Sequence, residues 1–348
     1  MLIVFYVSSH GLGHASRDIT LVQELLTLRP DARVIVRTSV PRWFFAPLGE
    51  SVEIHTLETD TGVVQADSLT LDEDQTARQA AVFFASFEHR VEMEAAMIRG
   101  VGANLVVGDI PPLACAAAAR AGVPSLMIGN FTWDWIYDSY PAFARTAPDV
   151  IPAIRRAYAT ATRALRLPLH GGFEPMAGVT RDIPFIARRS DRDPADTRRR
   201  LGIAGDRPVV LPSFGGHSAA LPLDALRRSG RFSLIEPVQH PPGGLLYQDL
   251  VAAADVVVSK PGYGIVSECV ANDTALLYTS RGRFIEYDLF VAEMPQILRC
   301  RFLSQDDLLA ARWDAAIEAV LAQPAPPVRP ALDGAAAAAR EALATAGA

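Results

Sequence analysis

Short apolar runs along the chain alternate with segments whose apolar residues recur at helical spacing. In the first half, the pattern predicts a buried strand at 2–7 and further strands at 33–37, 52–56, 105–107 and 125–128. Between them the spacing predicts helices at 19–28, 72–99 and 112–121. Strands that alternate with helices in this way indicate an α/β fold with a parallel sheet.

The same pattern restarts after a Pro- and Gly-containing segment at 167–172, following a stretch at 133–165 that we expect to be helical. Strands are predicted at 208–211, 232–236, 255–259 and 275–279, with helices at 247–254 and 265–271. We therefore expect two Rossmann-like domains, at 1–167 and 168–330, followed by an Ala-rich helix or tail at 331–348.

The first strand runs into a turn that contains His10, Gly13, His14 and Arg17 and then into a helix. Ligands of α/β proteins bind at such strand-to-helix turns, where glycine lets a ligand approach the backbone and the helix N-terminus favours an anion. A histidine there can move a proton near neutral pH. His14 acts either in catalysis, which we favour, or as a helix cap. His10 contacts phosphate or shapes the turn, and Arg17 binds an anion or forms a structural pair.

Two further glycine turns follow strands in the second half, and both can present backbone N–H groups to phosphate oxygens. Neither is a P-loop, because the chain has no GxxxxGK[ST] motif. Glu268 lies one helical turn beyond the second of these turns and could accept the ribose hydroxyls of a nucleotide. Each turn alone is explained by a tight bend that needs glycine, but the two together with Glu268 favour a nucleotide site. The residues of the two turns are Ser213, Phe214, Gly215 and Gly216, and Gly262, Tyr263 and Gly264.

The composition narrows the choice of partners. The 348 residues carry 33 basic and 39 acidic side chains, and no basic patch indicates a nucleic-acid partner. No apolar stretch reaches membrane-spanning length and no signal peptide is recognisable, so we expect a cytoplasmic protein without a transmembrane segment. The three cysteines have no metal-binding or disulfide spacing. Lys260 is the only lysine and opens the last glycine turn, which indicates either a required ammonium group or chance.

With these motifs the chain resembles the GT-B glycosyltransferase superfamily. Within it, the chain is most similar to the glycosyltransferase-like N-terminal domain of plant L-arabinokinases and to related bacterial proteins. The resemblance extends over nearly the whole chain, whereas the kinase half of those proteins has no counterpart. The segments that carry it are 10–17, 62–70, 109–112, 130–137, 213–216 and 260–268.

The resemblance implies two Rossmann-like domains that face each other across a cleft. It also implies a nucleotide-diphosphate sugar donor, UDP-sugar being favoured, that is bound mainly by the C-terminal domain, and an acceptor on the N-terminal side. The diphosphate would contact the glycine turns and Lys260, Glu268 would hold the ribose and Glu286 the donor sugar. His14 would be the general base, paired with Asp109 at the end of a neighbouring strand. No metal or other cofactor is expected.

Polar and aromatic residues at the same sheet edge complete the expected acceptor side. Trp133 and Asp134 follow the strand at 125–128, and Gln65 and Asp67 lie in a polar loop. Aromatic residues at this spacing are more often core, so we expect only one or two to face a ligand. The function we expect is metal-independent, inverting sugar transfer. The alternatives are a nucleotide-sugar hydrolase or epimerase of the same fold, and a non-catalytic protein that binds nucleotide sugars.

Overall fold

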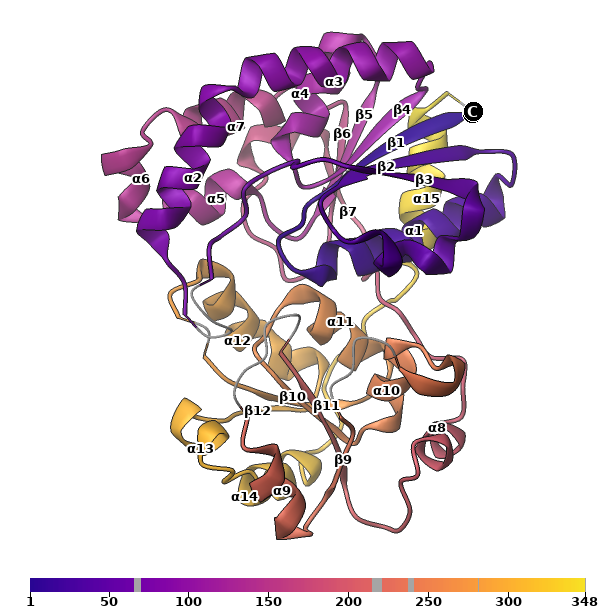
Figure 1. Cartoon of the computed structure of the whole chain (residues 1–348), viewed down its shortest axis with the longest axis vertical. Coiled ribbons are helices and arrows are strands. Elements are labelled where there is room, and N and C mark those ends of the chain that lie inside the picture. Colours follow the sequence, from indigo (N-terminus) through magenta and orange to yellow (C-terminus); the bar gives the residue numbers. More distant parts are fainter. Residues whose placement is uncertain (66–69, 215–220, 237–240, 281, 348) are drawn as a thin grey trace. The chain divides into compact units, whose positions relative to one another are not determined.

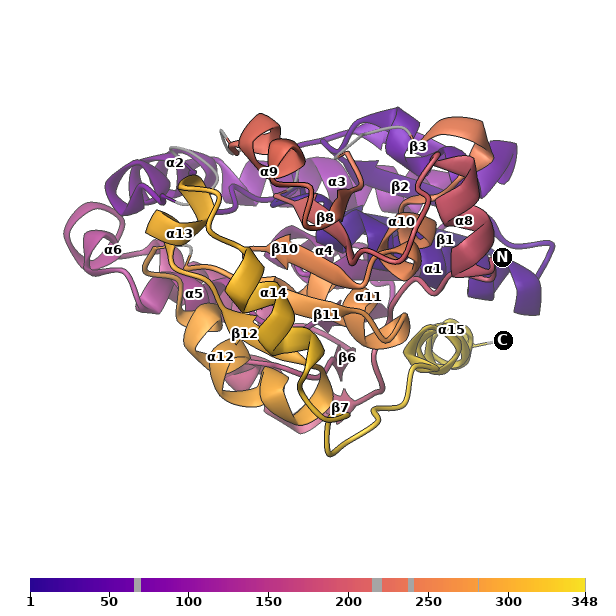
Figure 2. The ribbon, with the colours of Figure 1, turned by 90° about the horizontal axis from the view of Figure 1, so that it is seen from below.

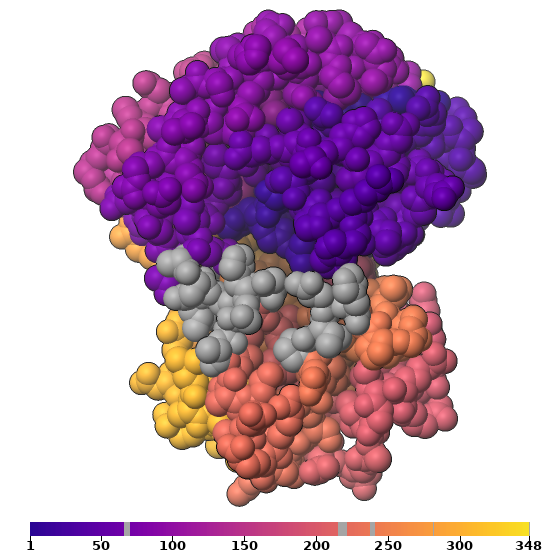
Figure 3. All heavy atoms as spheres, in the orientation of Figure 1, coloured from indigo at the N-terminus to yellow at the C-terminus, as the bar shows by residue number. Residues whose placement is uncertain are grey.

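A computed structural model describes residues 1–65, 70–214, 221–236, 241–280 and 282–347, and Figure 3 draws the other residues in grey. The chain divides into two compact units. The first unit comprises Met1–Val64, Asp72–Ile186 and Ala331–Ala348. The second comprises Gln65–Leu71 and Ala187–Pro330. Each unit has its own parallel sheet and is described by itself.

The first unit is built on a seven-stranded parallel sheet with the order β3-β2-β1-β4-β5-β6-β7. Its interior strand β1 is buried along its whole length, as expected of a parallel strand covered on both faces. The strands are β1 (Leu2–Val7), β2 (Arg33–Thr38), β3 (Val52–Thr56), β4 (Leu105–Asp109), β5 (Ser125–Gly129), β6 (Arg163–Arg166) and β7 (Thr180–Asp182).

Helices cover both faces of this sheet. Figure 1 shows α3 and α4 on one face, with α1 and α15 on the other. Helix α15 packs beside α1 through small buried side chains, which allow the two backbones to approach closely. The helices are α1 (Leu12–Leu28), α2 (Glu73–Ala85), α3 (Phe87–Val101), α4 (Pro112–Ala121), α5 (Trp133–Asp138), α6 (Pro141–Thr146), α7 (Val150–Tyr158) and α15 (Gly334–Thr345), with 3-10 helices η1 (Arg42–Ser51) and η2 (Glu174–Val179).

The second unit has a five-stranded parallel sheet with the order β12-β11-β10-β8-β9. One face packs on an apolar core centred on Trp313 and Phe232, whose rings stack 6.3 Å apart. Figure 2 shows α14 lying across β11 and β12. The strands are β8 (Val209–Ser213), β9 (Ser233–Leu234), β10 (Val256–Ser259), β11 (Ala275–Tyr278) and β12 (Cys300–Phe302). The helices are α8 (Pro194–Arg200), α9 (Leu223–Ser229), η3 (Pro242–Gly244), α10 (Tyr247–Ala253), α11 (Tyr263–Ala271), α12 (Ile285–Ile297), α13 (Gln305–Leu309) and α14 (Asp314–Leu321).

The predicted parallel α/β architecture is confirmed, with differences where the sequence pattern is weak. The stretch expected to be helical at 133–165 holds three short helices and the beginning of strand β6. Strand β7 was not predicted, because its three residues are mostly polar and lie at the sheet edge. Since β6 and β7 extend the first sheet, the first unit continues to Ile186, beyond the boundary expected at 167.

Two helices also begin earlier than their apolar pattern indicates. Helix α1 starts at Leu12, so that His14 and Arg17 are helical rather than part of a loop. Helix α11 starts at Tyr263, inside the glycine turn. The expected helix at 72–99 is divided at Ser86 into α2 and α3. In the part of the chain that the structure describes, no helix is long and apolar enough to cross a bilayer.

Candidate functional site

The predicted site residues fall into two groups, one at the carboxyl ends of the strands in each unit. In the first unit, β1 leads into α1 through Gly11, whose backbone φ of 78° is in the region that favours glycine. Strand β4 pairs directly with β1 and ends at Asp109 opposite Val7. This register brings Asp109 to the start of α1.

His14, Arg17 and Asp109 form a buried ionic cluster. The Nδ1 atom of His14 lies 2.8 Å from Oδ1 of Asp109. Arg17 donates through Nε to the other carboxylate oxygen, Oδ2, at 2.5 Å, and through Nη2 to Oδ1. Its third nitrogen, Nη1, donates to Oδ1 of Asn130 at 2.9 Å. The predicted contact between His14 and Asp109 is therefore present, and Arg17 joins it as a structural partner of the carboxylate.

The charges of this cluster favour a neutral histidine beside an ionised aspartate. Burial lowers the pKa of His14, and the nearby carboxylate of Asp109 only partly opposes this effect. Burial by itself would raise the pKa of Asp109, but Arg17 and His14 together hold it below its usual value. Nη2 of Arg17 also lies 2.9 Å from His14 Nδ1, but it donates to Oδ1 of Asp109. A neutral imidazole that donates its Nδ1–H to Asp109 leaves Nε2 as the nitrogen that can accept a proton.

Asp18 is a second carboxyl group of this region, and the sequence analysis did not single it out. It follows Arg17 on α1 and is 2% exposed, with no hydrogen-bond donor for either oxygen among the described residues. Burial and the charge of Asp109 raise its pKa well above the usual value, so the side chain is neutral when Asp109 is ionised. Asp18 can be recognised as unusual only from its burial, which depends on the tertiary structure.

His10 is held beside the cluster by a separate set of contacts. Its Nδ1 accepts a hydrogen bond from the backbone N–H of Val63 at 3.1 Å, and its ring meets the edge of Trp133 at 5.3 Å. Gly62 leaves room for this ring, because a Cβ at Gly62 would lie 2.9 Å from it. Trp133 in turn donates from Nε1 to Asp60 at 2.8 Å, and burial raises the pKa of Asp60 to about 7.

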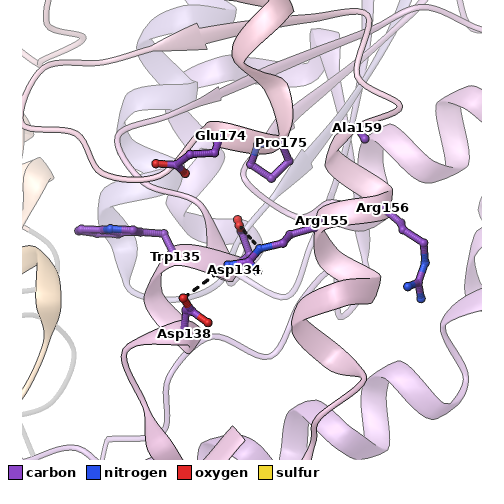
Figure 4. A pocket seen from close by; sticks show the side chains of 8 residues that line it. All are labelled: Asp134, Trp135, Asp138, Arg155, Arg156, Ala159, Glu174 and Pro175. Atoms are coloured by element: carbon purple, nitrogen blue, oxygen red, sulfur yellow. Dashed lines mark hydrogen bonds and ion pairs between the residues drawn. The ribbon is translucent and has the colours of Figure 1, made fainter. Parts of the chain in front are cut away.

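This arrangement corrects part of the expected acceptor side. Trp133 is 1% exposed and stacks on Tyr137, so it packs in the core and positions His10 instead of offering a face to a sugar. Asp134 is also buried, and it accepts a hydrogen bond from Nε of Arg155 at 3.1 Å. It lines a pocket together with Trp135, which is only partly buried (Figure 4). Gly13 lies in the first turn of α1, where its carbonyl accepts a hydrogen bond from Ser16.

In the second unit, the ends of β8 and β10 meet. Ser259 donates to the backbone carbonyl of Ser213, and the Ser213 hydroxyl contacts the hydroxyl of Tyr247. Lys260, directly after β10, donates from Nζ to Oε1 of Gln65 at 3.0 Å. The only lysine of the chain thus lies at the sheet edge where the predicted phosphate-binding turns begin.

Glu268 of α11 is buried and paired with an arginine. Arg188 donates from Nε to the carboxylate oxygen Oε1 at 2.7 Å, and its Nη2 forms an ion pair with the same oxygen at 2.5 Å. Its guanidinium also lies 5.6 Å from the centre of the Tyr247 ring. Burial raises the pKa of Glu268 above its usual value in spite of this cation. The sequence analysis missed Arg188, because it is one of many arginines and lies 80 positions away from its partner.

The other predicted donor residues are partly described. Gly262 precedes α11, and Gly264 lies in the first turn of that helix. Glu286 lies in the first turn of α12. Phe214 and Tyr263 are buried. Gly215, Gly216 and Asp67 lie outside the described residues. Among the residues that are described, no group of three or more His, Cys, Asp or Glu side chains could hold a metal ion.

The class of fold follows from comparison with solved structures: the chain has the two-domain α/β fold of GT-B glycosyltransferases. A UDP-glucosyltransferase from Polygonum tinctorium matches with a TM-score of 0.62 and 14% identity, over 100% of this chain and 98% of that one. The glycotransferase of kitacinnamycin matches with a TM-score of 0.60 and 18% identity, over 99% and 96% of the two chains. UGT2 from Phytolacca americana, complexed with UDP-2fluoro-glucose and pterostilbene, matches with a TM-score of 0.56 and 14% identity, over 99% and 93%.

A curated relative confirms the resemblance derived from the motifs. The chain is 30% identical to the L-arabinokinase of Arabidopsis thaliana over 339 residues, which is 91% of this chain. It spans about a third, 32%, of the length of that relative. No family model matches the chain.

Proposed function

We propose that this chain is an inverting glycosyltransferase that moves a sugar from a nucleoside-diphosphate sugar to an acceptor hydroxyl, with His14 as the general base. The observation that carries the proposal is the 2.8 Å contact between His14 Nδ1 and the buried Asp109 carboxylate. It holds a neutral imidazole in one orientation at the carboxyl end of a parallel sheet, where α/β proteins bind ligands.

The proposed reaction uses this histidine to move one proton. His14 takes the proton of the acceptor hydroxyl on Nε2, and the acceptor oxygen forms a bond to the anomeric carbon of the donor. The bond between that carbon and the diphosphate breaks, and the nucleoside diphosphate leaves with the electron pair. Asp109 stabilises the imidazolium that forms, and Arg17 keeps Asp109 ionised.

We propose that the second unit binds the donor and that the donor is a UDP-sugar. The glycine turns at the ends of β8 and β10, together with Lys260, provide N–H groups and a positive charge for the diphosphate. Glu268 accepts the ribose hydroxyls after exchanging part of its contact with Arg188. One structural neighbour is complexed with UDP and another with UDP-2fluoro-glucose, which supports the choice of nucleotide. The proposed reaction uses no metal ion.

The test is a panel of nucleotide sugars offered to the protein with and without sugar and phenolic acceptors, with EDTA present in one arm. Release of UDP that requires an acceptor and gives a glycoside with the opposite anomeric configuration supports the proposal. Release of free sugar without an acceptor would assign hydrolysis instead. Tight UDP-sugar binding with no product under any condition would assign a binding protein.

A further inference from the structure

A pocket of about 560 Å³ lies within the first unit, and no role has been given to it above. Its volume is within the range of small-molecule sites. In Figure 4, Trp135 and Glu174 lie on one side, Arg156 and Ala159 on the other, with Asp134 and Asp138 between them. The lining residues come from α5, from α7 and the residue that follows it, and from η2, and they are Asp134, Trp135, Asp138, Arg155, Arg156, Ala159, Glu174 and Pro175.

Two glycines leave space for the side chain of Trp135 at this pocket. A Cβ at Gly171 would lie 2.3 Å from Cζ2 of the Trp135 ring, and one at Gly172 would lie 2.9 Å from the Trp135 Cβ. Gly172 also has a φ of 82°, a conformation that side chains rarely adopt. Gly171 therefore leaves space for the indole and Gly172 for the base of the same side chain, and Trp135 is only partly buried. A positioned aromatic ring of this kind is a good partner for the C–H faces of a ligand.

The charged groups of the pocket are of both signs, with one carboxylate more than guanidiniums. Arg155 donates from Nε to Asp134 at 3.1 Å, and its Nη2 lies 3.5 Å from Asp138. Asp134 is 2% exposed, and its other oxygen, Oδ1, is buried without a hydrogen-bond donor among the described residues. Glu174 and Arg156 add one charge of each sign. Three carboxylates and two guanidiniums do not favour a phosphate, and they offer both acceptors and donors to neighbouring hydroxyl groups.

The pocket lies on a different side of α5 from the residues next to His10. Trp133 and Tyr137 are four positions apart on one side of the helix and stack at 5.3 Å. Asp134 and Asp138 are each one position further along, about 100° around the helix axis. One short helix therefore contributes to the contacts of His10 and, separately, to the pocket.

We propose that this pocket binds a neutral carbohydrate, with Trp135 contacting the C–H face of the sugar and the carboxylates and guanidiniums bonding its hydroxyl groups. Binding here does not depend on His14 acting as a base or on the second unit binding a nucleotide.

The test measures binding of L-arabinose, D-glucose and cellobiose by saturation-transfer NMR and calorimetry. At least one of the three is expected to bind the parent protein at millimolar concentration. Trp135→Ala should weaken that binding at least tenfold, whereas Trp43→Ala, a change at another tryptophan of the first unit that is 40% exposed, should leave it unchanged. Asp138→Asn is a second variant at an exposed position and should weaken binding about three- to tenfold through lost hydrogen bonds.

Three outcomes would overturn the proposal: no binding of any of the three sugars, equal binding by the parent protein and both pocket variants, or tighter binding of glucose 1-phosphate than of glucose. UDP binding is measured in parallel. A protein that binds the sugars through Trp135 but not UDP would contradict the proposed transferase function and leave the pocket assignment intact.

Discussion

Asp109 in the first unit and Glu268 in the second are both buried carboxylates bonded to an arginine, yet their pKa values move in opposite directions. Burial raises both. At Asp109, Arg17 reaches both oxygens and His14 adds a third contact, and these groups outweigh burial. At Glu268, both contacts from Arg188 are to a single oxygen, and burial prevails.

The difference indicates two kinds of site. The carboxylate of Asp109 is saturated by partners from its own unit, as expected for a group that orients a neighbour. Glu268 keeps one carboxylate oxygen, Oε2, to which Arg188 makes no bond, as expected for a group that exchanges a protein contact for a ligand hydroxyl. The following predictions test this comparison.

Replacing His14 should have the largest effect on activity. His14→Ala is expected to lower turnover about a hundredfold to ten-thousandfold, because it removes the general base that we propose. UDP affinity, which we assign to the other unit, should stay near the parental value in calorimetry. His89→Ala, at an exposed histidine of α3, is the matched control. Turnover near the parental rate would exclude His14 as the base, and lost UDP binding would make the first turn a phosphate site.

The two arginines should differ in their effect on stability. Arg17→Ala leaves the ionised Asp109 buried without its cation and should lower the free energy of unfolding by about 3–5 kcal/mol. Arg188→Ala should cost less, about 1–3 kcal/mol, because burial already raises the pKa of Glu268 and so lowers the cost of taking up a proton when the cation is removed. Urea denaturation measures both, with the exposed Arg29→Ala as control. Equal losses for Arg17 and Arg188 would remove the distinction between the two sites.

Glu268 should matter for the nucleotide more than for the fold. Glu268→Ala is expected to weaken UDP binding by about 1–3 kcal/mol through lost charge-assisted hydrogen bonds to the ribose. Calorimetry on the folded variant measures the change, and Glu236→Ala, at an exposed acid of the same unit, serves as the control. Unchanged UDP affinity would assign Glu268 to the structural pair with Arg188 alone.

Asp18 should give the smallest effect, seen as a dependence of stability on pH. Its folded-state pKa is raised above the unfolded value of 3.8, so the folded protein binds the proton more tightly. The contribution is fully present below about pH 3.8 and is lost as the pH rises through the folded-state pKa. Asp18→Asn should remove this loss and flatten the profile of melting temperature against pH. A profile identical to that of the parent would mean that Asp18 does not carry the buried proton.

Much of the framework was predictable from the sequence. The strands β1 and β3 have the predicted bounds. For β1 the reason is a continuous apolar run, which specifies a buried parallel strand, whereas β3 is a mostly exposed edge strand. Asp109 and the first turn could be placed at one sheet edge, because the carboxyl ends of parallel strands share an edge. Strands β6 and β7 could not be identified in this way, since they are short, carry arginine or polar residues and lie towards one edge of the sheet.

The sequence by itself determined the parallel α/β architecture, the positions of the glycine turns and the histidine at the first of them. Only the tertiary structure decided which charges meet. Arg17 lies 92 positions from Asp109 and Arg188 lies 80 positions from Glu268, and no local pattern pairs them. Burial also separated Trp133 in the core from Trp135 at the pocket, and it raised the pKa of Asp18. Local periodicity reports the elements of a fold, whereas ionisation and exposure depend on everything that packs around each group.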